Sequence, residues 1–277
     1  MVAETVIETP DTTTLVLFTG NDHLDYQAGH FLTIDPHQFE ALGRFTAFLE
    51  DLKRKKEPPR AYSMSSAPNE KYLAITVKEE RYSTGVTKYP PLLSPLLVKR
   101  TTRGMRFHVT GFTGPYTLPA DIESRTDQII HVCAGSGGVP NFSILKHALL
   151  NYPKLRHTFL YSNKIRQDII FRDALDRLEA VHPANLKIVH ALSREQDPAS
   201  HGPNFNKGRV TTELLNKNIP DPAGCLVYVC GPANSVHERA EAKAKGVDLP
   251  PRFFESVVTS LLEIGVPKDR IEHETYG

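Results

Sequence analysis

The sequence lacks tryptophan, has only three cysteines and three methionines, and contains no long uninterrupted apolar run. A membrane-spanning helix needs about 20 mostly apolar residues, so we expect no membrane span. Cys133, Cys225 and Cys230 are too few for a disulfide framework and lack metal-ligand spacing. They also cannot supply the four thiolates of an iron–sulfur cluster, which excludes an iron–sulfur centre within these residues.

An excess of charge of either sign is also missing. The 33 Lys and Arg residues nearly balance the 32 Asp and Glu residues, for a net charge of +1, which argues against nucleic acid as a partner. The start, "MVAETVIETP", lacks the basic end and apolar core of a signal peptide, so a cytoplasmic protein is expected. At 277 residues the chain is long enough for two domains of moderate size.

Short runs of alternating apolar residues fill the first part of the chain. They are "TLVLF", "HFLTID", "YLAITVKE" and "MRFHVTG", and glycine, proline and asparagine separate them. This pattern predicts an antiparallel sheet or barrel over residues 1–120. The segment "FEALGRFTAFLEDLKRKK" interrupts it and predicts a helical insertion near residues 38–56.

A different pattern follows a polar cluster near residues 119–127. Apolar strands alternate with amphipathic helices, as in "QIIHV" then "FSILKHALL" and "HTFLYS" then "IIFRDALDRLEAV". That order predicts an α/β domain over residues 121–277, built on a parallel sheet that helices cover.

The glycine-rich turn "CAGSGGVP" lies between a predicted strand and a predicted helix. Such a turn directs backbone N–H groups and a helix dipole toward an anion. Pro140 stands where the dinucleotide fingerprint G-x-G-x-x-G has its last glycine, and the Lys and Ser or Thr of a P-loop are absent. Alone, the turn is compatible either with phosphate binding or with a plain change of direction.

Two further stretches carry candidate residues. In "RAYS", Arg60 offers a planar fork suited to phosphate, Tyr62 an aromatic face and Ser63 a small donor and acceptor. The alternative is a strand with an exposed arginine and a half-buried tyrosine. In "YVCGP", Cys230 ends a strand at the expected ligand edge of the sheet, although a buried cysteine also serves as a small apolar residue.

Taken together and in this order, R-x-Y-S, G-S-G-G-x-P, C-G-P and a terminal E-x-Y resemble the ferredoxin–NADP reductase family of flavoprotein reductases. The segments "LYSNKIRQDIIFRDALDRL" and "GVPKDRIEHETYG" are also similar to that family, so the resemblance covers nearly the whole chain. It implies an N-terminal antiparallel barrel that binds flavin and a second domain that binds NAD(P)H.

For the flavin, the resemblance implies that Arg60, beside Ala61, holds the phosphate, that Tyr62 packs on the isoalloxazine and ribityl, and that Ser63 lies beside N5. A second phosphate-binding element corresponds to "PLLSPLL", where Ser94 is present but Pro91 replaces a glycine. FAD is the favoured cofactor, and FMN is the alternative.

For the nucleotide, the resemblance implies a pyrophosphate site and a nicotinamide site. Gly135, Ser136, Gly137 and Gly138 would wrap the pyrophosphate, and Cys230, Gly231 and Pro232 would border the nicotinamide. Glu274 would relay a proton or stabilise the charge-transfer state, and Tyr276 would lie against the flavin. The alternative for these last residues is a frayed, solvated tail.

The choice of donor depends on the residues after "FLYS". Ser162, Lys164 and Arg166 could hold the 2′-phosphate of NADPH, with Asp168 as the nearest acid in the sequence. NADPH is favoured over NADH, although both cations could be solvated.

The expected function is that of an NAD(P)H-dependent flavoprotein reductase without a fused ferredoxin. Ser63, Cys230 and Glu274 would act in transfer, and the acceptor would be a separate carrier such as an acidic ferredoxin or an oxygenase component. Two basic clusters favour an acidic partner, one at residues 53–56 and one formed by Lys99, Arg100, Arg103 and Arg106. The alternative function is a non-catalytic, redox-sensing subunit.

Overall fold

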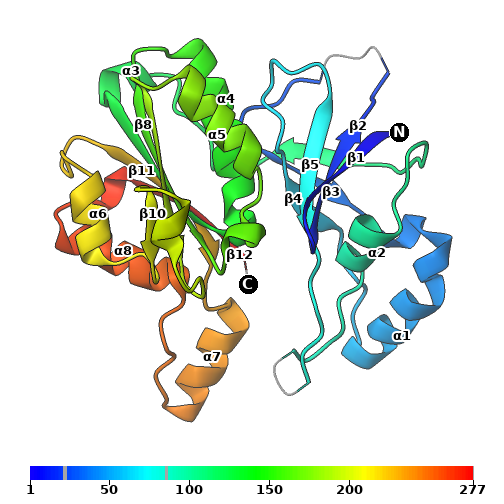
Figure 1. Cartoon of the computed structure of the whole chain (residues 1–277). Helices are drawn as coiled ribbons and strands as arrows, with labels where there is room; N and C mark the ends of the chain where they lie inside the picture. Colours follow the sequence, from blue (N-terminus) through cyan, green and yellow to red (C-terminus); the bar gives the residue numbers. More distant parts are fainter. Residues whose placement is uncertain (21–23, 85–86, 277) are drawn as a thin grey trace. The chain divides into compact units, whose positions relative to one another are not determined.

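The computed structural model describes residues 1–20, 24–84 and 87–276. The chain divides into two compact units, Met1–Thr117 and Leu118–Gly277 (Figure 1). Each unit has its own sheets and its own buried core.

The first unit contains two three-stranded sheets in which every neighbouring pair is antiparallel. One sheet has the order β1 (Val2–Thr9), β2 (Thr12–Leu17) and β5 (Leu73–Lys78). The other has the order β4 (Arg60–Ser63), β3 (Phe31–Ile34) and β6 (Thr110–Thr113). Leucine and isoleucine side chains from both sheets and from α2 (Ser94–Lys99) form one core. The antiparallel N-terminal fold predicted from the alternating runs is confirmed.

One predicted strand begins later than expected. "MRFHVTG" spans residues 105–111, but β6 starts only at Thr110. The side-chain amide of Gln38 donates to the carbonyl of His108 at 2.9 Å and accepts from its N–H at 2.6 Å, so a side chain replaces a strand partner there. Phe107 and Val109 nevertheless pack against the core.

The helical insertion consists of two 3₁₀ turns, Pro36–Gln38 and Glu40–Leu42, followed by α1 (Gly43–Lys53). Thr46 and Leu49 face inward and are buried. Arg54 ends the helix in the left-handed conformation, with φ at 52°. The helix therefore lies against the first unit along one face and leaves the opposite face exposed.

The second unit is built on a six-stranded parallel sheet, as predicted. Its spatial order is β10 (Phe205–Lys207), β9 (Leu186–Leu192), β8 (Arg156–Asn163), β7 (Gln128–Ala134), β11 (Leu226–Pro232) and β12 (Ile271–Tyr276). The chain starts at β7, moves outward through β8 and β9, and returns to the other side of β7 with β11. The strand order thus reverses between β7 and β11, which is where ligands bind in open sheets of this kind.

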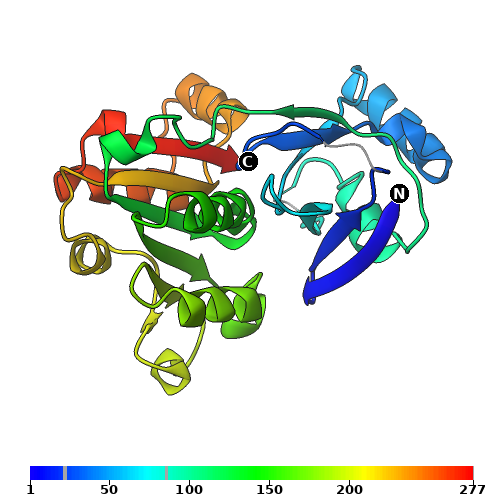
Figure 2. The same ribbon diagram turned by 90° about the horizontal axis from the view of Figure 1, so that it is seen from above.

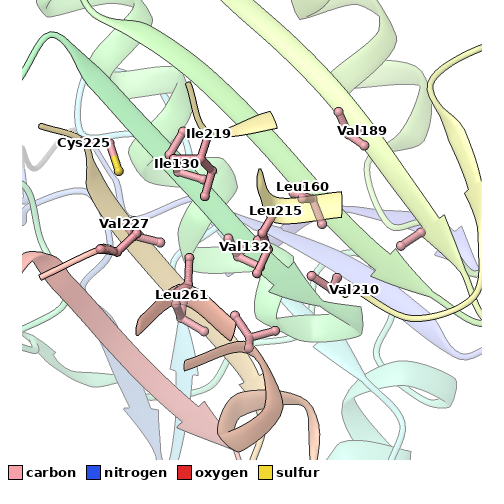
Figure 3. Close-up of a cluster of buried hydrophobic side chains, with 14 residues drawn as sticks. Ile130, Val132, Leu160, Val189, Val210, Leu215, Ile219, Cys225, Val227 and Leu261 are labelled. Carbon is pink, nitrogen blue, oxygen red and sulfur yellow. The ribbon is translucent and has the colours of Figure 1, made fainter. Parts of the chain in front are cut away.

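Helices cover both faces of this sheet (Figures 1 and 2). On one face, α4 (Gly138–Asn151) and α5 (Arg172–Val181) bury aromatic and aliphatic side chains against β7 and β8. On the other face, α6 (Thr212–Asn218) and α8 (Phe253–Glu263) enclose the cluster in Figure 3, in which Val132, Leu160 and Val227 come from three neighbouring strands. Two short helices, α3 (Ile122–Arg125) and α7 (Val236–Lys245), complete the unit.

The nearly continuous apolar strands, such as "QIIHVCA", follow from burial on both faces. Within the described ranges, none of the helices has the length and apolar character needed to cross a bilayer.

Candidate functional site

The glycine turn lies at the point where the strand order reverses. It follows β7 as a 3₁₀ turn, Gly135–Gly137, and continues directly into α4. A Cβ at Gly137 would lie 2.1 Å from the carbonyl oxygen of Cys230 in β11. Only a residue without a side chain permits this approach, so the "GSGG" and "CGP" stretches are in backbone contact.

Two side chains outside the motif hold the carbonyls of the turn. The Tyr161 hydroxyl, from β8, donates to the Gly135 carbonyl at 2.6 Å, and the Asn141 amide donates to the Gly137 carbonyl at 3.0 Å. Gly135 adopts φ of +53°, and nothing lies within 4 Å of the position that its Cβ would occupy. These two bonds fix the carbonyl groups of the turn, whereas the space beside Gly135 is open. The first N–H groups of α4 lack partners within the helix. This arrangement fits an anion.

A buried polar chain continues from Asn141 into the sheet. The Asn141 Oδ1 lies 2.9 Å from His131 Nδ1, and His131 Nε2 lies 3.3 Å from His157 Nδ1. Because an amide oxygen can only accept, His131 carries its proton on Nδ1. Burial lowers the pKa of His131 to about 4 and holds the pKa of His157 well below its ordinary value. Both rings are therefore neutral, and they connect the turn to the centre of the sheet.

Cys230 and Glu274 are direct neighbours across β11 and β12. The Tyr276 hydroxyl donates to Glu274 Oε2 at 3.3 Å, and the Tyr276 carbonyl accepts from the N–H of Ala233 at 3.3 Å. The terminal residues thus form a strand, not the frayed tail considered as an alternative. Burial, with the nearby Glu274 carboxylate, raises the pKa of the Cys230 thiol well above its ordinary value. Cys230 is an uncharged thiol and therefore a poor nucleophile.

The end of β11 depends on a second close contact. A Cβ at Gly231 would lie 2.6 Å from the ring of Phe253 in α8 and 3.2 Å from the Cβ of Ala134. Gly231 is buried, whereas the following Pro232 is exposed. The chain therefore leaves the sheet directly beside the glycine turn.

The residues considered for the 2′-phosphate lie after β8. Ser162 is half-buried, Lys164 is exposed, and Arg166 opens the 3₁₀ turn Arg166–Asp168. The Arg166 Nε is buried without a hydrogen-bond partner among the described residues. This donor lacks an acceptor in the described part of the fold, which keeps Arg166 a candidate for binding an anion.

An acidic residue from a neighbouring strand end, Glu195, contacts the same loop. Glu195 Oε2 accepts from the backbone N–H of Arg166 at 3.0 Å. Glu195 follows β9, which pairs with β8 in parallel, so the two loops meet at one edge of the sheet. Glu195 therefore binds the backbone of Arg166 and not its guanidinium, and places a negative charge beside the loop considered for the 2′-phosphate.

In the first unit, the candidate flavin residues occupy β4, which pairs with β3. The Arg60 guanidinium donates to Glu57 Oε2 at 2.5 Å and to the Pro58 carbonyl at 2.9 Å. The Glu57 side chain is only 1% exposed and also accepts from Lys53 Nζ at 2.5 Å. These cations hold the pKa of Glu57 below its ordinary value against the effect of burial. One carboxylate between two cations leaves a net positive charge beside β4, which suits a phosphate.

Tyr62 and Ser63 follow on the same strand, after the exposed Ala61. Tyr62 is half-buried against the core of the first unit, and burial raises the pKa of its phenol, which therefore stays neutral. Ser63 is 7% exposed and lies opposite Phe31 in β3. The strand thus carries a neutral aromatic ring and, at the next position, a small buried hydroxyl on the other face.

Ser94 opens α2 as expected, but its hydroxyl is already bonded. It accepts from the N–H of Glu80 at 3.1 Å and donates to Glu80 Oε2 at 3.3 Å, and the side chain is buried. In this structure Ser94 positions the start of α2, and its hydroxyl is not offered to a ligand.

Groups of three or more histidine, cysteine or acidic side chains able to hold a metal are absent from the part of the chain that the structure describes. The residues that gather at the edge formed by β7, β11 and β12 are glycines, a neutral thiol and one carboxylate. This set suits a nucleotide better than a metal ion.

Known proteins are similar in sequence to this chain. The oxidoreductase NAD-binding domain family matches residues 131–238. The ferredoxin reductase component of 3-ketosteroid-9-alpha-monooxygenase from Mycolicibacterium smegmatis is 30% identical over 282 residues, which cover 99% of this chain and 64% of that protein. Flavohemoprotein A from Dictyostelium discoideum is 26% identical over 222 residues, which cover 79% of this chain and 47% of that protein. The chain thus spans roughly half to two thirds of the length of these relatives.

Solved structures show the same fold. The FAD/NAD binding domain of nitric oxide dioxygenase from Vibrio cholerae superimposes with a TM-score of 0.73 at 23% identity and covers 100% of this chain and 97% of that one. A ferredoxin-NADP+ reductase from Plasmodium falciparum superimposes with a TM-score of 0.66 at 21% identity and covers 99% and 94%.

The family match lies on the unit that holds the glycine turn and the C-G-P stretch, and the fold neighbours extend over both units. The resemblance inferred from the four motifs is confirmed. Residues 131–238 form an oxidoreductase NAD-binding domain, and the chain as a whole is similar to flavoprotein reductases of the ferredoxin reductase type.

Proposed function

We propose that this chain is an NAD(P)H-dependent flavoprotein reductase that holds FAD in the first unit and NAD(P)H in the second, and passes electrons to a separate carrier. The observation that carries the proposal is the backbone contact between Gly137 and Cys230 at the strand-order reversal, with Glu274 directly beside Cys230. Relatives support it, since one is a ferredoxin reductase component and one neighbour is an FAD/NAD binding domain.

The first unit supplies the flavin-binding residues in this proposal. When bound, FAD accepts a hydride from NAD(P)H and passes the electrons on. Arg60 binds a phosphate oxygen with the donors that Glu57 and Pro58 leave unused, and Tyr62 covers an aromatic ring. Ser63 supplies a small hydroxyl at the next position of the strand. FMN remains the alternative, since the Ser94 hydroxyl bonds to Glu80.

The second unit binds and orients the donor. The N–H groups at the start of α4 bind the pyrophosphate, while Tyr161 and Asn141 keep the carbonyls of the turn directed away from it. The neutral, buried Cys230 and the small Gly231 border the nicotinamide without adding a charge or a bulky side chain. Glu274 holds or moves a proton at its carboxylate, to which Tyr276 donates. We place this reaction in the cytoplasm, because the three cysteines are free, as in a reducing compartment.

The direct test is purification followed by turnover. The chain should be yellow, release FAD on denaturation and oxidise NADPH or NADH when a small uncharged quinone is the acceptor. Flavin binding without nucleotide oxidation would instead favour a redox-sensing subunit. A folded, colourless protein that takes up neither FAD nor FMN would contradict the whole proposal.

Cofactor preference provides a second prediction. Lys164→Ala and Arg166→Ala should raise KM for NADPH several-fold more than KM for NADH, because only NADPH carries a 2′-phosphate. Glu195→Gln is the matched variant, since it retains an acceptor for the Arg166 N–H but removes the negative charge. It should lower KM for NADPH. Equal changes for both nucleotides would remove this loop from 2′-phosphate recognition.

A further inference from the structure

The helical insertion carries an apolar ridge that the core of the first unit does not use. Phe48 is 56% exposed and Leu52 is 53% exposed on the outer face of α1, and the partly exposed Phe45 stacks on Phe48 with ring centroids 6.4 Å apart. The spacing i, i+3, i+7 aligns these three side chains on one side of the helix. A solvated helix face gains nothing from two adjacent phenylalanines, so this ridge marks a contact surface.

The opposite face of α1 is firmly attached to the first unit. Glu50 Oε1 accepts from the Glu57 N–H and lies 2.8 Å from His37 Nε2. Lys53 binds the buried Glu57, which also binds Arg60 of β4. One buried carboxylate therefore connects the helix that bears the ridge to the strand proposed to hold the flavin phosphate. The helix that bears the ridge is therefore fixed to the first unit.

Positive charge gathers at both ends of the ridge. Residues 43–56 contain five cations and two carboxylates, a net charge of +3, whereas the whole chain carries +1. Arg44 lies at the start of the helix, and Lys55 and Lys56 lie just beyond its end; all three are exposed. The basic cluster expected at residues 53–56 includes Lys53, but this side chain is only 23% exposed and is bonded to Glu57. Lys53 therefore contributes little exposed positive charge. Arg54 is paired with Asp51 at 2.8 Å.

We propose that this ridge, Phe45, Phe48 and Leu52 between Arg44 and Lys55–Lys56, is the docking surface for the electron-accepting protein, an acidic carrier with an apolar centre inside a rim of carboxylates. This inference rests on the proposed function, which identifies the partner as an electron acceptor. An apolar centre with a charged rim is the usual anatomy of a protein interface. The cationic ends select an acidic partner and accelerate its association.

Two other occupants fit less well. A second copy of this chain would bring cations together in either orientation, since both ends of the ridge are positive. An anionic lipid surface favours a helix with a continuous basic face, whereas the exposed cations without an ion pair in the described part of the chain, Arg44, Lys55 and Lys56, lie only at the two ends of this ridge. An apolar centre with charge at its ends suits a protein better than a bilayer.

The test compares two acceptors, an acidic [2Fe–2S] ferredoxin and a small uncharged quinone, with the FAD-loaded chain. Phe48→Ser with Leu52→Ser should lower kcat/KM for the ferredoxin at least about tenfold, because these side chains form the centre of the contact. Lys55→Gln with Lys56→Gln should slow ferredoxin reduction several-fold at low salt and flatten its salt dependence. Ile7→Ser, which removes a side chain that is 79% exposed elsewhere in the same unit, is the control.

Quinone reduction and FAD content should be unchanged in every variant, which separates docking from the proposed function. If the parent itself reduces no quinone, the proposed function is wrong. If only the docking inference is wrong, quinone reduction remains, and ferredoxin reduction is either absent or the same in all variants. Binding to phosphatidylserine vesicles that Phe48→Ser abolishes would overturn the inference in favour of a membrane. A dimer that Phe48→Ser dissociates would overturn it in favour of self-association.

Discussion

Replacing Gly137 by alanine is expected to weaken NAD(P)H binding strongly. The new Cβ would lie 2.1 Å from the carbonyl oxygen and 2.5 Å from the carbonyl carbon of Cys230, and these backbone atoms belong to a central strand. The turn must therefore move away from β11, which also displaces the start of α4. Overpacking of this kind costs about 1–3 kcal/mol or more. We expect KM for the nucleotide to rise at least about tenfold, with a lower melting temperature for the second unit.

Gly135→Asn is the matched control within the same turn. Its Cβ would meet nothing within 4 Å, and asparagine tolerates the left-handed conformation that φ of +53° requires. This variant should keep the melting temperature of the parent while it weakens nucleotide binding, since its side chain enters the open side of the turn. FAD content should be unchanged in both variants. If Gly137→Ala bound NAD(P)H as the parent does, the turn would not be the pyrophosphate site.

Acidification is expected to destabilise the second unit well before its carboxylates titrate. Burial lowers the pKa values of His131 and His190 to about 4 and that of His157 in the same direction, whereas these side chains have a pKa near 6.5 in an unfolded chain. Between these values the unfolded chain binds more protons than the folded chain. The stability that depends on these neutral histidines is therefore fully present above about pH 6.5 and falls as the pH drops toward 4. From pH 7 to pH 5 the loss is about 2 kcal/mol each for His131 and His190.

Hydrogen exchange of peptides from β7 and β8, corrected for the intrinsic rate, measures this loss at pH 7, 6 and 5. His131→Gln should lower the slope of the unfolding free energy against pH by the equivalent of about one bound proton, because it removes one titrating group. His237→Gln, at a site whose side chain is 76% exposed, should leave the decrease unchanged. His37 acts in the opposite direction, since Asp35 and Glu50 raise its pKa, but it lies in the first unit. Equal protection of β7 and β8 at pH 7 and pH 5 would contradict the assignment of neutral, buried histidines.

Local patterns were sufficient to predict the strands and helices around the glycine turn. The run "QIIHVCA", the glycines and the amphipathic segment after them are contiguous, so each element depends on its own residues. The strand predicted from "MRFHVTG" was partly wrong because its partner at His108 is the side chain of Gln38, 70 residues away. Periodicity carries no information about a side chain that replaces a strand.

The same limit applies to the candidate site. The motifs pointed to Arg60, Gly137, Cys230 and Glu274, whose types fit the chemistry directly. The residues that position them were missed, because their contacts join separate elements. Glu195 reaches Arg166 across 29 residues, and Tyr161 reaches Gly135 across 26. Glu57 is only three residues from Arg60, but it lies outside the motif, and its burial between two cations depends on the fold. Burial of a charged residue is decided by its partners in three dimensions.

The most direct test of this account is the anaerobic mixing of the FAD-loaded chain with NADPH, and in parallel with NADH, while the visible absorbance of the flavin is followed. We expect the flavin absorbance of the parent to be lost with at least one of the two nucleotides, and Gly137→Ala, which still holds FAD, to need at least about tenfold more nucleotide for the same loss. Flavin that stays oxidised in the parent at saturating concentrations of both nucleotides would contradict the assignment of this chain as a reductase.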